Sequence, residues 1–75
     1  MMSMRYTVVH EKSRTGWGAY APDLPGCGAT GRTLPLVRRR IQWAIKAHVR
    51  GLRDDGLRVP RPRAMAEVVE TGDAA

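Results

Sequence analysis

Apolar and polar residues alternate along two short stretches near the N-terminus. In residues 4–11, Tyr6 and Val8 fall on one side, and charged or hydroxyl side chains fall mostly on the other. This alternation is typical of a strand with one buried face. Residues 17–21 follow after a polar connector of five residues that ends in Gly16. Because connectors of this length join adjacent antiparallel strands, we predict a hairpin.

Residues 34–55 show a helical period instead. At about 100° per residue, one apolar stripe faces a core. A second, smaller apolar patch lies about 140° from that stripe, so one sheet cannot cover both. We therefore predict that a second subunit, or the crossover through Pro60 and Pro62, covers Trp43. The stripe is Leu34, Val37, Ile41, Ala44, Ile45, His48 and Leu52, and the patch is Leu36, Trp43 and Ala47.

Prolines and glycines gather between the hairpin and the helix. Pro22 and Pro25 lack an amide donor and have a fixed φ, so the chain must turn here. Gly26 offers the positive φ that a tight turn after proline often requires, and Asp23 can close a turn through its side chain. We predict a rigid turn, then a strand over residues 27–31, with the helix capped by Thr33.

Beyond the helix, Gly56 provides a C-terminal stop, and the prolines that follow predict an extended crossover. Residues 64–70 alternate weakly and predict a final strand. The fold class is therefore α+β: a small antiparallel sheet in the order β-β-β-α-β, with one long helix packed on one face. We expect residues 1–75 to form a single domain, ordered over about residues 4–70, without a separate DNA-binding domain. Met1, Met2 or Met4 could each be the start.

Composition limits the class of protein. The chain has 75 residues, four of them aromatic, and a small domain of this kind buries too little surface to be very stable alone. We therefore expect a homo-oligomer, a dimer or a tetramer. A single cysteine, Cys27, excludes an internal disulfide, and no apolar run approaches the roughly 20 residues of a membrane helix. The sequence favours a soluble, cytoplasmic protein that does not associate with membranes.

The sequence does not favour an enzyme. A metal-dependent nuclease site needs several converging carboxylates, and the helix has none before Asp54. His10 and His48 are too far apart for a metal motif, so we expect no metal and no cofactor. Cys27 is more typical of a small buried filler than of a nucleophile. Asp23 is more typical of a turn residue than of a general base.

The string Tyr-Ala-Pro-Asp-Leu-Pro-Gly-Cys at residues 20–27, followed by Gly-Arg-Thr at residues 31–33 and a helix, resembles the signature of the HicB-like antitoxin family. The resemblance covers about residues 4–70. It implies a fold similar to a truncated ribonuclease H without its catalysis. It also implies that the chain binds a HicA-type mRNA-cleaving toxin and neutralises it by occlusion. The residues expected to contact this partner are Pro22, Asp23, Leu24 and Pro25.

The charge balance supports a different class of function. Thirteen basic residues against seven acidic ones give a net charge of +6, which favours an acidic partner such as nucleic acid. Arg38-Arg39-Arg40 and the loop of Arg61 and Arg63 would form that surface. A third alternative is an oligomeric domain without a toxin partner. In any of these cases Leu36, Trp43 and Ala47 are the predicted oligomer interface.

Overall fold

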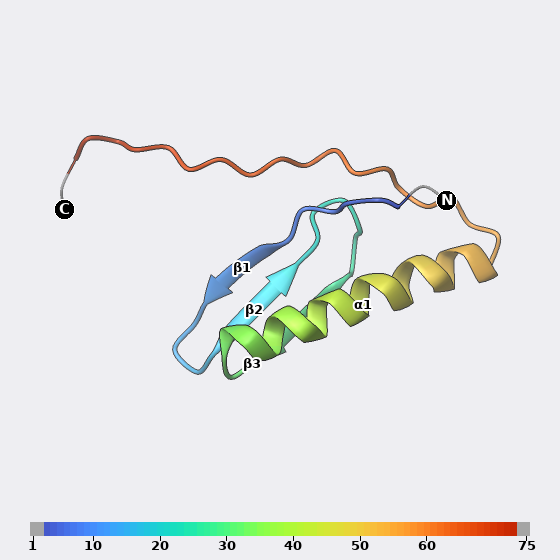
Figure 1. Cartoon of the computed structure of the whole chain (residues 1–75), viewed down its shortest axis with the longest axis horizontal. Coiled ribbons are helices and arrows are strands. Elements are labelled where there is room, and N and C mark those ends of the chain that lie inside the picture. Colours follow the sequence, from blue (N-terminus) through green and yellow to red (C-terminus); the bar gives the residue numbers. More distant parts are fainter. Residues whose placement is uncertain (1–2, 74–75) are drawn as a thin grey trace.

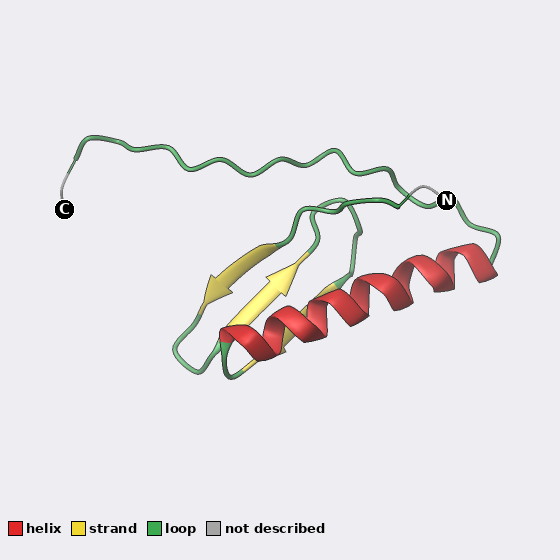
Figure 2. Ribbon diagram, in the orientation of Figure 1, coloured by secondary structure: helices red, strands yellow, loops and turns green. Residues whose placement is uncertain are grey.

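The computed structural model describes residues 3–73 and contains three antiparallel strands followed by one long helix (Figure 1). The sheet has the order β1-β2-β3, and α1 packs across one of its faces (Figure 2). The α+β class predicted from the periodicity is confirmed. The elements are β1 (Val9–Lys12), β2 (Trp17–Tyr20), β3 (Gly28–Gly31) and α1 (Leu34–Asp54).

The register of the sheet places small residues beneath the helix. His10 lies opposite Ala19 across β1 and β2, and Ala19 lies opposite Ala29 across β2 and β3. Side chains in such a row point to the same face of a sheet. Ala19 is buried in the core together with Val37 and Ile41 of α1. The row therefore faces the helix, and its alanines let α1 approach β2 and β3 closely.

The core is small and draws on the turn as well as on the helix. Leu24 is 1% exposed and Val37 is 0% exposed, and these are the two largest fully buried side chains. The predicted stripe of α1 is buried most deeply in its first half, because the second half of the helix runs past the ends of the strands (Figure 1). The buried residues are Ala19, Ala21, Leu24, Cys27, Val37 and Ile41.

Both ends of α1 are capped as predicted. The Thr33 hydroxyl accepts a hydrogen bond from the Leu36 amide at 3.3 Å. At the other end Gly56 has φ +68°, and the Leu57 amide donates to the Leu52 carbonyl at 2.8 Å. This pattern is a Schellman motif, in which a glycine adopts the left-handed conformation just beyond the helix. The helix ends at Asp54, one residue earlier than predicted.

The turn between β2 and β3 consists of two short hydrogen-bonded turns. The Leu24 amide donates to the Ala21 carbonyl and the Cys27 amide donates to the Leu24 carbonyl, each at 3.0 Å. The Ala21 amide closes the loop by donating to the Cys27 carbonyl at 3.2 Å. Gly26 has φ +81°, which confirms the positive φ predicted for it.

The predicted final strand over residues 64–70 is wrong for the isolated chain. A strand needs a neighbouring backbone, whereas the chain at Arg63 and Ala64 binds the side chains of Asp23 and Thr7. Residues 57–73 are extended but belong to no strand, and they run away from the sheet after Ala64 (Figure 1). We call residues 57–64 the strap and residues 65–73 the arm. The first strand is also shorter than predicted, since β1 begins at Val9.

Candidate protein-binding surface

The strap is fastened across the N-terminal segment and the turn. The Tyr6 hydroxyl donates a hydrogen bond to the Pro60 carbonyl at 2.6 Å, and the Thr7 hydroxyl donates to the Ala64 carbonyl at 2.6 Å. The amides of Arg63 and Ala64 both donate to Oδ2 of Asp23, at 2.8 and 2.9 Å. Four hydrogen bonds thus tie the chain after the helix to residues at the start of the chain and in the turn.

Asp23 has a structural role in this arrangement. The hydrogen bonds from the amides of Ala64 and Arg63 lower the pKa of its carboxyl group, because they stabilise the charged form. A carboxylate held in this way is a strong acceptor and a poor base. Asp23 lies in the turn as predicted, but its carboxylate accepts hydrogen bonds from the strap and not from the turn, which backbone bonds close. The side chain therefore anchors the strap.

The predicted partner residues separate into two pairs. Leu24 is 1% exposed, so its side chain belongs to the core and is not available for contact in this conformation. Asp23 is half-buried and is engaged with the strap. Pro22 and Pro25 are exposed. The Leu24 side chain therefore packs in the core and the Asp23 side chain binds the strap. The two prolines remain exposed and form a rigid apolar rim.

The strap places arginines beside this rim. A shallow recess is lined by Pro22, Asp23, Arg58, Pro60, Arg61 and Arg63. The sequence places the turn and the arginine loop about 35 to 40 residues apart, and no periodicity joins them. The sequence feature that could have suggested this contact is Asp23, an acidic residue in the turn whose carboxylate can accept hydrogen bonds from another segment.

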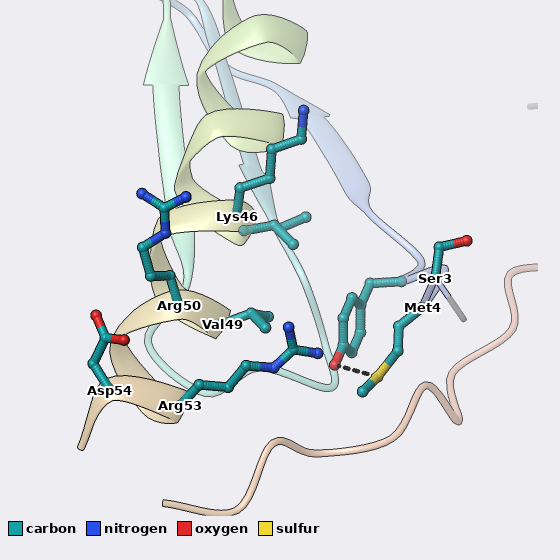
Figure 3. Close-up of a pocket in the computed structure, with 9 residues that line it drawn as sticks. Ser3, Met4, Lys46, Val49, Arg50, Arg53 and Asp54 are labelled. Atoms are coloured by element: carbon teal, nitrogen blue, oxygen red, sulfur yellow. Dashed lines mark hydrogen bonds between the residues drawn. The ribbon is translucent and has the colours of Figure 1, made fainter. Parts of the chain in front are cut away.

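A second surface lies on the β1 side of the helix, where an open groove of about 510 Å³ contains Met4, Tyr6 and Val49 (Figure 3). Its rim carries Lys46, Arg50, Arg53 and Asp54 from the last turns of α1. Burial raises the pKa of the Tyr6 hydroxyl, and the nearby Arg53 guanidinium opposes that shift. Because apolar side chains line the groove and three positively charged ones lie at its rim, it can hold an apolar group flanked by negative charge.

The third surface contains Trp43. Its side chain is 73% exposed, so the strap through Pro60 and Pro62 does not cover it, and that alternative is wrong. Trp43 lies beside the free edge of β3, where the Arg40 guanidinium donates a hydrogen bond to the Thr30 carbonyl at 2.9 Å. We call this surface the β3 groove. Its lining is Gly28, Ala29, Thr30, Leu36, Arg39, Arg40, Trp43 and Ala44.

The three consecutive arginines of α1 do not form one ridge. Arg38 lines a recess on the β1 side with Val8 and His10, whereas Arg39 and Arg40 line the β3 groove. Successive helical residues are about 100° apart, so three in a row span about 200°, just over half of the circumference. The basic surface predicted from this run is therefore divided between two sides of the molecule.

Within residues 3–73, no group of three or more His, Cys, Asp or Glu side chains is placed to hold a metal ion. Cys27 is buried, and its burial raises the pKa of the thiol, which disfavours the reactive thiolate. In the described part of the chain, α1 is the sole helix, and it is too polar to span a bilayer.

The described residues thus form a three-stranded α+β scaffold with a braced turn, an open cationic groove and an exposed tryptophan. The sequence matches the model of the HicB-like antitoxins of bacterial toxin–antitoxin systems over residues 6–75, and the chain belongs to that family. This result confirms the resemblance found in the turn signature. Members of the family are typically not enzymes.

Two curated relatives are similar over most of this chain. A UPF0150 protein from the archaeon Thermoplasma acidophilum is 34% identical over 62 residues, which cover 81% of this chain and 90% of the relative. An uncharacterised 14.9 kDa protein from the rep-hol intergenic region of Haemophilus phage HP1 is 29% identical over 66 residues. That match covers 88% of this chain but only 50% of the phage protein.

Proposed function

We propose that this protein is an antitoxin that binds a HicA-type mRNA-cleaving toxin and neutralises it by occluding its surface. Membership of the HicB-like family supports a toxin partner. The observation that supports the location of the contact is the braced turn. Pro22 and Pro25 are exposed there, whereas Leu24 is buried and Asp23 is hydrogen-bonded. A surface fixed before binding loses little conformational entropy when a partner docks.

Charge affects how the toxin is held. RNA-binding toxins of this kind tend to be basic, and the recess beside the turn carries Arg58, Arg61 and Arg63. Two basic surfaces repel each other, so the contact depends on the prolines and on hydrogen bonds more than on long-range attraction. Occlusion by shape is therefore the mechanism that we favour over charge neutralisation.

The test is co-expression with a small toxin encoded by the adjacent gene, followed by co-purification and a growth assay. The double substitution Pro22→Ser and Pro25→Ser should release the toxin, whereas Thr15→Ala in the β1–β2 loop, at the other end of β2, should retain it. Melting curves of both variants would separate lost contact from lost folding. A toxin that co-purifies equally well with the double variant would place the contact elsewhere. A toxin that stays active beside the wild-type chain would overturn the function.

A self-association surface is part of the proposal. Leu36, Trp43 and Ala47 lie on one face of α1, and the exposure of Trp43 supports the view that another chain covers it. Exposed tryptophans of this kind are typical anchors of protein interfaces.

Nucleic-acid binding is the second candidate, favoured by the cluster of Arg58, Arg61 and Arg63 beside the turn. We expect such binding to be weak, indifferent to sequence and lost as salt rises, because phosphate contacts alone carry no base recognition. Titration of a labelled RNA at two salt concentrations tests this expectation. Tight binding of one sequence at physiological salt would make nucleic acid the principal partner.

A further inference from the structure

The molecule exposes far more surface than its mass requires. Its accessible area is 6624 Å², whereas a compact monomer of 8.3 kDa exposes about 4,600 Å². Its radius of gyration is 14.6 Å, against about 11 Å for a compact chain of this length. The excess of about 2,000 Å² is more than the roughly 800 Å² that each partner buries in a standard interface.

Much of this excess belongs to the arm. Met65 is 81% exposed, Val68 is fully exposed and Val69 is 77% exposed. These residues are interspersed with Glu67 and Glu70 in an extended segment that belongs to no strand. An extended apolar segment with free backbone groups is suited to lie along the edge of another sheet.

The arm also differs from the rest of the chain in charge. All 13 basic residues and four of the seven acidic ones precede Ala64, so that part carries a net charge of +9. The arm contains Glu67, Glu70 and Asp73 and has a charge of −3. One chain therefore holds both an acidic apolar segment and the basic surfaces that complement it.

The β3 groove has the matching features. Trp43 and Leu36 supply apolar area, Arg39 and Arg40 supply positive charge, and β3 supplies a free edge. The arm of the same chain does not occupy this groove, because the strap is bonded to Thr7 and Asp23 and the arm continues from it on the β1 side, away from β3 and α1 (Figure 1).

We propose that the arm of each copy docks as an extended segment in the β3 groove of a second copy, giving a dimer in which the two arms are exchanged. Trp43 is the anchor on the receiving side. Because successive side chains of an extended segment point to opposite faces, one of the two adjacent valines, Val68 or Val69, enters the groove and the other covers its outer side. Glu67 and Glu70, which lie on opposite faces of the extended arm, bring negative charge to Arg39 and Arg40. Arg40 gives up its bond to the Thr30 carbonyl as the arm pairs with β3. This arrangement specifies how the self-association surface proposed above is covered, and it does not depend on the toxin.

A second copy fits this groove better than a basic toxin does. The receiving surface is itself cationic through Arg39 and Arg40, so it repels a basic partner and attracts the acidic arm. In a two-fold dimer the contact between arm and groove occurs twice, so the dimer buries twice the area of a single contact.

Sedimentation equilibrium of the full-length chain provides the first test. We expect a dimer at micromolar concentration. Trp43→Ala should weaken the dimer at least about tenfold, and the double substitution Val68→Ser and Val69→Ser should weaken it comparably. Circular dichroism of each variant should show the wild-type helix content, since none of these side chains is in the core. A wild-type monomer, or a dimer that neither variant weakens, would overturn the proposal.

A charge exchange tests the pairing itself. Glu67→Arg with Glu70→Arg should disrupt the dimer, as should Arg39→Glu with Arg40→Glu, and the four changes together should restore it. Arg58→Glu with Arg61→Glu makes the same charge change on the strap and should leave the dimer intact. Failure of the combined variant to recover would place the arm elsewhere.

A photocrosslinker locates the arm directly. Trp43 is replaced by benzoylphenylalanine, and the protein is mixed with a copy labelled with ¹⁵N. We expect crosslinks from position 43 to residues 65–70 of the other isotopic species. Crosslinks confined to one species, or to residues outside the arm, would refute the exchange.

Discussion

The strap and the arm have the same extended backbone and follow one another directly, yet only the strap is fixed. Residues 57–64 form four hydrogen bonds with the body of the protein: their carbonyls accept from Tyr6 and Thr7, and their amides donate to Asp23. Beyond Ala64 the apolar side chains of the arm project into solvent. The difference shows that an extended segment is held in place only where the rest of the protein provides hydrogen-bonding groups for its backbone. Here those groups are side chains and not a strand edge.

The largest effect should follow from removing the support beneath the turn that carries Asp23. Leu24→Ala deletes most of a fully buried side chain and should lower the free energy of unfolding by about 3 kcal/mol. Leu57→Ala makes the same deletion in the strap, where the side chain is 57% exposed, and should cost less than about 1 kcal/mol. Urea unfolding of the two variants measures the contrast. Equal losses would mean that the strap is packed as firmly as the core.

A smaller effect should follow from straining the same turn. Gly26 has φ +81°, and a Cβ there would meet no atom within 4 Å, so the cost of a side chain is conformational alone. Gly26→Val should destabilise the fold by about 1 to 3 kcal/mol. Gly26→Asn should cost clearly less, because asparagine tolerates positive φ. Thermal unfolding compares them, and an unchanged melting temperature for Gly26→Val would show that the turn adopts another conformation in solution.

The smallest effect should be local and should depend on pH. The folded pKa of Asp23 lies below its usual value of 3.8, so the anchoring bonds are fully present above that pH and are lost as pH falls through the folded pKa. Asp23→Ala should unfasten the strap at neutral pH.

Amide hydrogen exchange measures this effect. At neutral pH the amides of Arg63 and Ala64 should be protected in the wild type and should exchange rapidly in Asp23→Ala. Protection of these amides that survives in the variant would show that other bonds hold the strap.

The local features of this fold could be predicted from the sequence. Gly26 after Pro25 required a positive φ, Thr33 preceded a helical period, and Gly56 ended it, and in each case the cause lies within a few residues. The turn signature also predicted the family. The fate of residues 64–70 could not be predicted in this way, because weak alternation favours a strand but does not say which edge it pairs with.

The candidate site was only partly predictable. Proline and glycine indicated the turn, but the burial of Leu24 depends on Val37 and Ile41, which arrive from the helix. Likewise the recess beside Pro22 exists because Asp23 binds amides some 40 residues further along the chain. Contacts between segments so far apart leave no periodic trace in the sequence.

The sequence separation of the strap contacts bears on the order of folding. Tyr6 and Pro60 are 54 residues apart, and Thr7 and Ala64 are 57 apart, whereas the hairpin, the turn and the helix close over short loops. Long loops are slower to close, so the strap should fasten last, after the sheet and α1 have assembled. By the same reasoning it should detach first in native-state fluctuations, opening residues 57–73 as a unit while the core remains folded.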